Sequence, residues 1–223
     1  MKVSIVIPTK NEGKTIGEVI DKVRPYGDDV VVVDSKNTKD DTREVAESKG
    51  ARVLVDNGVG KGDGIRVAIK TLDSDVLVFI DADGSHIPED IPKVVAPIKE
   101  GKADMVIASR MLGGSEELYG TIFEAIRLFA NVAITLIINY RWNVRITDSQ
   151  NGFRAIKTSV AKDLDLKADI FDIETEMLMK CLKKGYCVGE VPSRELSRRH
   201  GKSGINIVTM GPRYLWRVLV NLF

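Results

Sequence analysis

The stretch Val76-Leu77-Val78-Phe79-Ile80-Asp81-Ala82-Asp83 contains five apolar residues followed directly by two carboxylates that flank a small residue. The apolar run has the length and the β-branched content of a buried parallel strand. Its carboxylates then fall at the carboxyl end of that strand, where open α/β sheets bind ligands. Paired carboxylates at such an edge suit a hard divalent cation such as Mg²⁺ or Mn²⁺. A simpler alternative is that Asp81 ends the strand and Asp83-Gly84 forms a turn.

Apolar runs alternate with amphipathic segments through the first 110 residues. Strands are predicted at residues 3–7, 30–33, 52–55, 76–80 and 103–108, with Pro8 ending the first. Helices are predicted at residues 11–23, 40–50, 60–70 and 88–99. Such an alternation is typical of an α/β fold in which helices flank a doubly wound, mostly parallel sheet.

After residue 110 the pattern changes to longer helices. They are predicted at residues 121–140, 171–184 and 205–223, with a strand at 187–191 and a basic polar loop at 197–204. The sequence contains no internal repeat and no low-complexity linker. A chain of 223 residues is also long enough to bury one large core. We therefore expect a single domain spanning residues 1–223.

The composition excludes several classes of protein. The 33 basic and 32 acidic residues give a net charge of +1, whereas a general nucleic-acid binder is far more basic. Cys181 and Cys187 have no second pair or His cluster to complete a zinc site, so they are expected to be reduced thiols. The start of the chain lacks a signal-peptide pattern, and charged or polar residues interrupt the apolar stretch 122–138. We expect a cytoplasmic protein with no membrane-spanning helix and no nucleic-acid partner. The sequence does not indicate an oligomeric state.

Polar and charged residues directly follow four of the predicted strands. They are residues 8–12 after the first strand, Asp34 after the second, Asp81 and Asp83 after the fourth, and Ser109-Arg110 after the fifth. The carboxyl ends of parallel strands meet at one edge of a sheet. These side chains are therefore expected to form one site.

Eight short motifs occur in order along the chain. They are residues 5–12 (IVIPTKNE), 31–34 (VVVD), 60–62 (GKG), 81–86 (DADGSH), 109–110 (SR), 148–154 (DSQNGFR), 174–176 (ETE) and 198–203 (RRHGKS). Each motif is weak alone, but the ordered set covers nearly the whole chain. It resembles the family 2 glycosyltransferases of GT-A fold, most closely dolichyl-phosphate mannose synthase and its polyprenyl-phosphate relatives. The resemblance implies a nucleotide-sugar-binding half at residues 1–110 and an acceptor half at residues 111–223.

The resemblance implies a pocket for the nucleotide-sugar. Its residues would be Pro8, Thr9, Glu12, Asp34, Lys61, Gly62, Asp81 and Ala82. Asp34 or Glu12 would accept hydrogen bonds from the ribose or the base, although Glu12 also suits an acidic cap on the first helix. The glycines beside Lys61 would let the backbone approach the nucleotide. Because Ser35 and Lys36 stand where many relatives have a second Asp, the choice of base stays open.

The resemblance also implies a metal site and an anion site. Asp81 and Asp83 would bind Mg²⁺ or Mn²⁺ beside the diphosphate of the donor, and Ser85 stands where relatives often have a glutamine ligand. The phosphate of the acceptor would bind to Arg110, Arg127, Arg199 and Lys202. The catalytic residues would be Asp83, Arg110 and Asp148, with Asp148 on the acceptor side.

Three functions follow as hypotheses. In the first, an oxygen of a dolichyl or polyprenyl phosphate attacks the anomeric carbon of the sugar and inverts it. The second pKa of a phosphate monoester is about 6, so this nucleophile needs no strong base at neutral pH. The sugar would be mannose from GDP-mannose first and glucose from UDP-glucose second.

In the second hypothesis a soluble hydroxyl acceptor reacts, and Asp148 is the best candidate for the base that it would require. The third is a non-catalytic nucleotide-sugar-binding or membrane-scaffold protein. It is disfavoured because Asp34, Asp81, Asp83 and Arg110 are all present.

The helix predicted at residues 121–140 has two interpretations. In the first, apolar residues at helical spacing pack into the core: Ile122, Ala125, Ile126, Phe129, Val132 and Ala133. In the second, which the resemblance implies, the helix lies in the membrane interface together with the aromatic and basic residues at 141–142 and 214–217. The protein would then attach peripherally to the cytoplasmic face of the membrane.

Two acids fall close together on the helix predicted at residues 171–184. Glu174 and Glu176 are two positions apart, and such residues do not share a helix face. At most one of them is therefore expected to point inward, towards Arg154 or the basic loop, and the other to be solvated.

Overall fold

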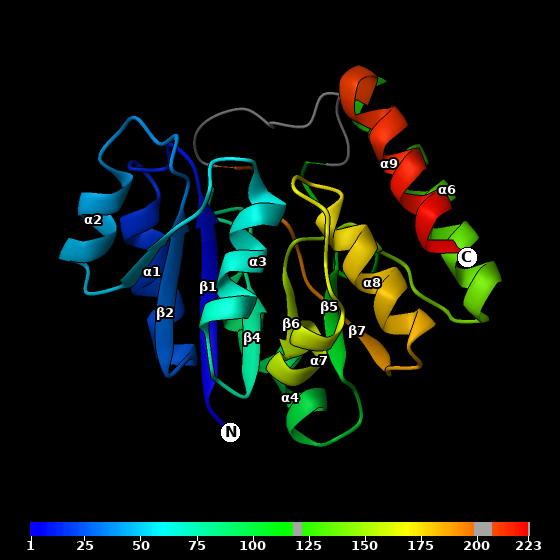
Figure 1. The fold of residues 1–223 in the computed structure, drawn as a ribbon, viewed down its shortest axis with the longest axis horizontal. Helices are drawn as coiled ribbons and strands as arrows, with labels where there is room; N and C mark the ends of the chain where they lie inside the picture. The colour runs from blue at the N-terminus through cyan, green and yellow to red at the C-terminus, as the bar shows by residue number, and fades with distance from the viewer. Residues whose placement is uncertain (118–121, 199–206, 223) are drawn as a thin grey trace.

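The computed structural model describes residues 1–117, 122–198 and 207–222, and Figure 1 shows its elements. The strands are β1 (Val3–Thr9), β2 (Asp29–Asp34), β3 (Arg52–Val55), β4 (Val76–Phe79), β5 (Met105–Ser109), β6 (Arg154–Lys157) and β7 (Val188–Pro192). The α-helices are α1 (Ile16–Val23), α2 (Thr42–Ser48), α3 (Lys61–Thr71), α4 (Ile91–Lys99), α5 (Arg110–Gly113), α6 (Ile122–Trp142), α7 (Thr158–Asp163), α8 (Ile173–Lys183) and α9 (Ile207–Leu222). Two short 3₁₀ helices, η1 (Arg24–Tyr26) and η2 (Pro88–Asp90), precede β2 and α4.

Within the described residues, seven strands form one sheet in the order β3-β2-β1-β4-β6-β5-β7. The pairs β1·β2, β1·β4, β2·β3 and β5·β7 are parallel, whereas β6 runs antiparallel to β4 and β5. The predicted doubly wound, mostly parallel sheet is therefore confirmed. β1 continues past its expected end, because Pro8 and Thr9 stay in register with Val33 and Asp34 of β2.

β6 and α7 are absent from the predicted elements. Two of the four residues of β6, Arg154 and Lys157, are charged, so the segment lacks the apolar pattern of a buried strand. Arg154 is nevertheless only 1% exposed. Its guanidinium donates to the backbone carbonyl oxygens of Ser149, Asn151 and Glu174. These carbonyl groups replace water around the charge, which makes its burial tolerable.

Helices cover both faces of the sheet (Figure 1). One face packs against α1, α2 and α4, and the other packs against α3, α7 and α8. In β4, Val78 faces the first group of helices and Leu77 faces the second. Because both faces are covered, the strand reads as a continuous apolar run rather than an alternating one.

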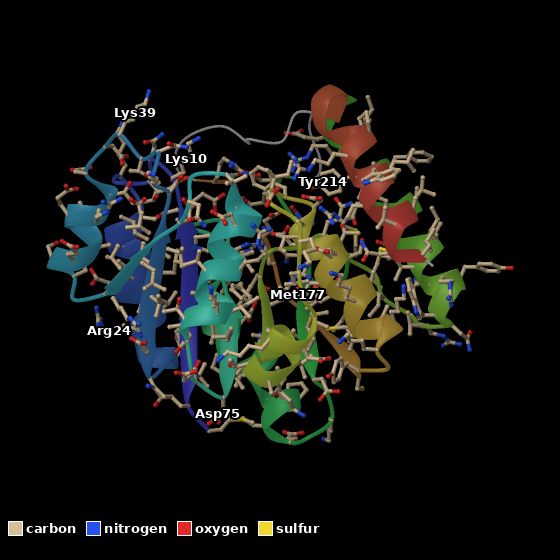
Figure 2. All side chains as sticks on the ribbon, in the orientation of Figure 1. Lys10, Arg24, Lys39, Asp75, Met177 and Tyr214 are labelled. Carbon is tan, nitrogen blue, oxygen red and sulfur yellow. The ribbon has the colours of Figure 1, made fainter. Side chains whose placement is uncertain are left out.

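The antiparallel direction of β6 brings a second part of the chain to the functional edge. β1, β2, β4 and β5 end at the same edge, and β6 begins there, so residues 148–153 reach it from the opposite direction. The Asn151 side-chain N–H donates to the carbonyl oxygen of Ala108 at the end of β5. In Figure 2, Lys10 and Tyr214 lie at this end of the molecule and Asp75 lies at the other.

α6 and α9 lie side by side at one end of the molecule, in green and red in Figure 1. Asn131, Thr135 and Ile138 of α6 are buried, whereas Phe129 and Leu136 are 75% and 62% exposed. The core interpretation of this helix is wrong for four of its residues, because the helix turns their side chains outward: Ala125, Ile126, Phe129 and Val132. Among the described residues, no helix combines the length and apolarity needed to cross a bilayer.

Candidate active site

A cavity of about 790 Å³ opens at the carboxyl edge of the sheet. Nine of the predicted site residues line it: Pro8, Thr9, Glu12, Lys61, Asp81, Ala82, Asp83, Arg110 and Arg127. Four others do not reach its surface: Asp34, Gly62, Ser85 and Asp148. Arg199 and Lys202 lie outside the described residues. Several of the residues predicted at strand ends in the first 110 residues therefore line one cavity together with Arg127 from the second half of the chain.

Lys61 lies at the start of α3 and forms ion pairs with two carboxylates. Its Nζ lies 2.6 Å from Asp81 Oδ1 and 2.8 Å from Glu174 Oε1, while His86 Nε2 lies 3.3 Å from Asp81 Oδ2. Burial alone would raise the pKa of Asp81, but Lys61 and His86 hold it well below its usual range. Conversely, the two carboxylates outweigh the burial of Lys61 and raise its pKa. A Cβ at residue 152 would lie 2.7 Å from Lys61 Nζ and 3.0 Å from Asp81 Oδ2, so a larger residue there would push on this ion pair.

Asp83 has one carboxylate oxygen held inside the protein. Its Oδ1 accepts hydrogen bonds from the backbone N–H of Ser85 at 3.0 Å and from the Ser85 hydroxyl at 2.7 Å. Its Oδ2 lies 3.5 Å from Nη1 of Arg198, which also donates from Nε to Glu117 at 3.0 Å. Ser85 is 2% exposed and does not line the cavity, so its expected role as a third metal ligand does not fit this geometry. It orients Asp83 instead.

The two aspartates fit a hard divalent cation whose remaining ligands come from phosphate and water. Asp81 and Asp83 both line the cavity. Mg²⁺ is usually bound by one or two carboxylates together with substrate phosphates. Within the described part of the chain, no group of three or more His, Cys, Asp or Glu residues could hold a metal. A cation at this site would therefore depend on the donor for part of its coordination.

Arg110 reaches the cavity from the start of α5 and is held from behind by Asp148. Its Nε and Nη2 lie 2.7 and 3.0 Å from the two carboxylate oxygens, and Asn131 donates to the same carboxylate at 3.1 Å. Burial alone would raise the pKa of Asp148, but the guanidinium holds it below its usual range. Asp148 is 0% exposed and does not line the cavity. The expected catalytic role of Asp148 therefore does not fit this geometry, because the carboxylate cannot touch a substrate; Asp148 positions Arg110.

Asp34 is also buried behind the cavity, at the end of β2. Its carboxylate accepts hydrogen bonds from the Thr9 hydroxyl at 3.1 Å, the Thr38 hydroxyl at 2.7 Å and Arg43 Nη2 at 2.9 Å. Asp34 is 0% exposed, so the expected hydrogen bond from ribose or base to its carboxylate does not fit this geometry. Asp34 instead holds Thr9, which does line the cavity.

Gly60 and Gly62, at the start of α3, make room for the backbone of residues 168 and 169. A Cβ on Gly62 would collide with the carbonyl oxygen of Ala168, and one on Gly60 would lie 2.6 Å from the carbonyl oxygen of Asp169. The backbone N–H of Asp63 donates to the same Asp169 oxygen at 3.1 Å. The lack of a side chain on Gly62 therefore serves the packing against residues 168 and 169, and its expected contact with the nucleotide stays a prediction.

Glu174 and Glu176 are both buried, at 4% and 1% exposed, so the expectation that one of them is solvated is wrong. Glu174 faces Lys61. Glu176 accepts hydrogen bonds from the backbone N–H groups of Lys167 and Ala168 at 2.9 and 2.6 Å. The two side chains do point in different directions, but protein covers α8 on both sides.

Among the cavity residues that lie outside the predicted set are Ser35, Asp56 and Arg198. Asp56 directly follows β3, so the strand-end rule that identified Asp81 also identifies Asp56 when it is applied to the third strand. Arg198 belongs to the basic loop in which Arg199 and Lys202 are predicted, and it contacts Asp83. The loop was recognisable from the sequence, but the position of Arg198 beside Asp83 was not.

The cavity extends from these polar groups to apolar side chains of α6 and α9. Ile134 and Ile137 of α6 line it, as does Leu215 of α9. Tyr214, labelled in Figure 2, also lines it and donates from its hydroxyl to the carbonyl oxygen of Phe171 at 2.6 Å. Charged and apolar walls therefore belong to one cavity.

A crystal structure of glucosyl-3-phosphoglycerate synthase from Mycobacterium tuberculosis, in complex with Mn²⁺, UDP and phosphoglyceric acid, has the same fold. The TM-score is 0.77, and the match covers 99% of this chain and 78% of that chain at 22% sequence identity. This likeness confirms the predicted GT-A fold.

Curated relatives match almost the whole chain. Uncharacterized protein MJ1222 of Methanocaldococcus jannaschii is 31% identical over 98% of this chain and 91% of its own. UDP-N-acetylglucosamine–dolichyl-phosphate N-acetylglucosaminyltransferase of Methanococcus voltae is 26% identical over 97% of this chain and 94% of its own. Dolichol-phosphate mannosyltransferase of Pyrococcus furiosus is 29% identical over 98% of this chain, which spans 64% of that protein.

The family model described as "Glycosyl transferase family 2" matches residues 4–165. Because the match extends over well more than half of the chain, this protein belongs to glycosyl transferase family 2.

Proposed function

We propose that this protein transfers a hexose from a nucleotide-sugar to the phosphate of a dolichyl or polyprenyl lipid, with inversion at the anomeric carbon. One observation carries the proposal: paired aspartates, arginines and apolar side chains of α6 and α9 line a single cavity. A donor diphosphate suits the aspartates through a cation, an acceptor phosphate suits the arginines, and an isoprenoid chain suits the apolar wall. The relatives from M. voltae and P. furiosus are named for transfer to dolichyl phosphate, which supports the same class of acceptor.

For the donor, GDP-mannose is the first candidate and UDP-glucose the second. The resemblance to dolichyl-phosphate mannose synthase favours GDP-mannose, as does the name of the P. furiosus relative. The M. voltae relative is named for a UDP-sugar, so membership of the family does not decide the base. Residues that line the cavity and would contact the nucleotide-sugar are Pro8, Thr9, Glu12, Lys61 and Ala82.

Asp81 and Asp83 would hold a Mg²⁺ or Mn²⁺ ion. When bound, such a cation offsets the negative charge that develops on the leaving nucleoside diphosphate. Lys61 adds a fixed positive charge beside Asp81. Because Lys61 and His86 keep Asp81 ionised, this carboxylate is ready to bind a cation without first losing a proton.

Arg110, Arg127 and Arg198 would bind the phosphate of the acceptor. All three line the cavity. The bidentate contact with Asp148 fixes the direction of the Arg110 guanidinium, so it loses little conformational freedom when it binds an anion. Arg199 and Lys202 remain predictions for the same role, because both lie outside the described residues.

The acceptor phosphate would itself be the nucleophile. The second pKa of a phosphate monoester is about 6, so one of its oxygens is already an anion at neutral pH. A hydroxyl acceptor would instead need a general base within hydrogen-bonding reach. Asp148, the candidate for that base, is buried and paired with Arg110. This geometry removes Asp148, the base expected for a soluble hydroxyl acceptor, and is compatible with a phosphate acceptor that needs none.

A lipid acceptor also requires the cavity to lie close to a membrane. Phe129 and Leu136 of α6 and Trp216 and Leu219 of α9 are exposed apolar side chains on the two helices that line the apolar end of the cavity. Helices of this kind lie in the interface of a bilayer with their apolar side inserted. Peripheral attachment to the cytoplasmic face of the membrane is therefore part of the proposal.

The test is a transfer assay with a short polyprenyl phosphate, Mg²⁺ or Mn²⁺, and each of GDP-mannose, UDP-glucose and UDP-N-acetylglucosamine, followed by mass spectrometry of the lipid. We expect a lipid-linked hexose with inverted anomeric configuration. Asp83→Asn should lower turnover by about 100-fold or more, the scale of losing one group that stabilises transition-state charge. Asp73→Asn is the matched control, because Asp73 is 90% exposed and lies outside the cavity.

Three results would contradict the proposal. They are retention of the anomeric configuration, transfer to a soluble hydroxyl in the absence of lipid, and full activity of the Asp83→Asn variant.

A further inference from the structure

One end of the cavity lies at β2 and β3, away from the paired aspartates. Val33 and Ser35 from the end of β2 line it there, together with Asp56 from the end of β3. The strand order β3-β2-β1-β4 puts three inter-strand spacings, about 14 Å in all, between β3 and the strand that carries Asp81. If the diphosphate lies at Asp81 and Asp83, as the proposed function requires, a nucleoside directed along this edge brings its base to Asp56.

The carboxylate of Asp56 is fixed in direction. The residue is 7% exposed, and its Oδ1 accepts hydrogen bonds from the backbone N–H groups of Lys36 at 2.9 Å and Gly58 at 2.6 Å. Its Oδ2 lies over Gly64, 3.6 Å from the position that a Cβ there would occupy. Gly64 lines the same cavity. One oxygen is thus anchored to the backbone while the other lies beside the cavity wall.

The other acids near this end are less suited to contact a base. Asp34 is 0% exposed, and three protein groups already donate to its carboxylate. Glu12 lies on the β1 side of the cavity, where its Oε2 accepts a hydrogen bond from the Thr15 hydroxyl. Asp56 lies at this end, directly after β3, and its Oδ2 receives no hydrogen bond from any residue that the structure describes. Asp56 is therefore the acid with an acceptor oxygen left for a ligand at this end.

An ionised carboxylate can only accept hydrogen bonds, so it selects for a base edge that carries donors. Guanine presents two adjacent donors, N1–H and the N2 amino group. Uracil presents a single donor, N3–H, between two carbonyl oxygens. A carboxylate repels these oxygens, because both groups carry negative charge on oxygen. We propose that Asp56 determines the nucleobase of the donor by accepting hydrogen bonds from the Watson–Crick edge of guanine. This inference rests on the proposed donor site and assigns to that site its base.

Calorimetric titration of the whole chain with GDP, IDP and UDP in the presence of Mn²⁺ tests the assignment. IDP lacks the N2 amino group and keeps N1–H, so it should bind less tightly than GDP and more tightly than UDP. GDP should bind about 10- to 100-fold more tightly than UDP, which is the range for hydrogen bonds to a charged group. This comparison uses the unsubstituted protein and so does not depend on the folding of a variant.

The Asp56→Asn variant makes the test residue-specific. Its amide oxygen can still accept from Lys36 and Gly58, while an NH₂ group replaces the acceptor beside the cavity. We expect the GDP-to-UDP affinity ratio to fall by about tenfold or more, because the amide now donates to carbonyl oxygens of uracil and opposes the donors of guanine. Asp73→Asn is the matched control and should leave the ratio unchanged.

The outcomes separate this inference from the function on which it rests. Equal binding of GDP and UDP, a preference for UDP, or an unchanged ratio in the Asp56→Asn variant overturns the role of Asp56 and leaves sugar transfer standing. Failure of all three nucleotides to bind overturns the donor site itself and the inference with it.

Discussion

Charged side chains at this site are held by other protein groups before a ligand arrives. Lys61 is fixed between Asp81 and Glu174, and Arg110 is fixed against Asp148. Groups that are already oriented stabilise developing charge without reorganising during the reaction. Residues that hold these side chains in place, such as Glu174 and Asp148, therefore contribute to the site as the residues that line the cavity do.

Asp148 gives the first test at this scale. Replacing it with Asn leaves the Arg110 guanidinium buried without its bidentate carboxylate. Breaking a buried ion pair from one side costs about 3–5 kcal/mol, and we expect the free energy of unfolding to fall towards the lower end of that range because Glu195 lies 3.4 Å from Arg110. Urea denaturation at pH 7 measures the loss.

The pH dependence of the same variant follows from the pKa of Asp148. Because the folded protein depresses this pKa, the stabilisation from Asp148 is complete above the unfolded value of about 4 and is lost as the pH falls below it. The difference in unfolding free energy between the two proteins should therefore shrink between pH 7 and pH 3.5. A difference that stays constant over this range would show that Asp148 is not depressed by its partner.

The residue-level predictions from sequence identified side-chain chemistry better than side-chain direction. Asp81, Asp83 and Arg110 follow strands, and that position alone takes them to the cavity. Asp34 is the last residue of β2, yet it turns towards Thr38 and Arg43, which lie in the loop and helix beyond it. Contacts of that kind depend on how the next segment folds back, and no local pattern encodes them.

At the scale of elements, α3 shows how one helix serves both the fold and the site. Its first turn packs against residues 168–169 through Gly60 and Gly62, while Lys61 and Gly64 line the cavity. Gly64 lies inside the helix, where glycine is less favourable than alanine by about 1 kcal/mol. Its lack of a side chain keeps space open between Val33 and Asp56.

Gly64→Ala should therefore raise stability and lower nucleotide affinity together. The new Cβ would lie 3.4 Å from Val33 Cγ1 and 3.6 Å from Asp56 Oδ2, which the fold can accommodate. We expect the free energy of unfolding to increase by up to about 1 kcal/mol. The affinity for GDP, measured by calorimetry, should fall about tenfold, because a methyl group occupies the space of the base.

Gly189→Ala in β7 is the control for this substitution. Its new Cβ would meet only Ala103 and Val106 at ordinary contact distances, outside the cavity. A Gly64→Ala variant that binds GDP as tightly as the unsubstituted protein would remove Gly64 from the base-binding end.

The helices and strands of the first 110 residues were predictable because each buried strand there reads as an apolar run. β6 was not predictable, because the charged residues Arg154 and Lys157 interrupt the apolar pattern of a buried strand. Its place between β4 and β5 also depends on contacts between residues distant in sequence. α6 was predictable as a helix but its orientation was not. Its buried side carries Asn131 and Thr135, which hydrogen bond within the protein, so polarity alone assigns the wrong side to the core.

At the scale of the whole molecule, α6 and α9 lie together at one end of the protein with apolar residues outward (Figure 1). α9 is attached through polar contacts: Arg217 Nε lies 2.8 Å from Asp172 Oδ2, and the Tyr214 hydroxyl donates to Phe171. Its outer residues Trp216 and Leu219 are 66% and 47% exposed. A pair of helices that is attached partly through polar contacts and exposes large apolar side chains to solvent is typical of a surface that another apolar phase covers.

This arrangement predicts that substitutions on the outer side weaken membrane attachment without affecting the cavity. Leu136 and Trp216 are the clearest positions, because both are more than 60% exposed and neither lines the cavity. A Leu136→Gln, Trp216→Gln double variant should bind liposomes at least about tenfold more weakly, since full burial of one such side chain is worth about 1.5–3 kcal/mol. Thermal unfolding and GDP affinity should stay unchanged.

Val55→Gln, which alters an exposed apolar residue on β3 instead, is the control and should leave liposome binding unchanged. The measurement is flotation of the protein with liposomes in a density gradient. Equal flotation of the double variant and the unsubstituted protein would mean that the outer side of these helices does not contact the lipid, and that the acceptor reaches the arginines by another route.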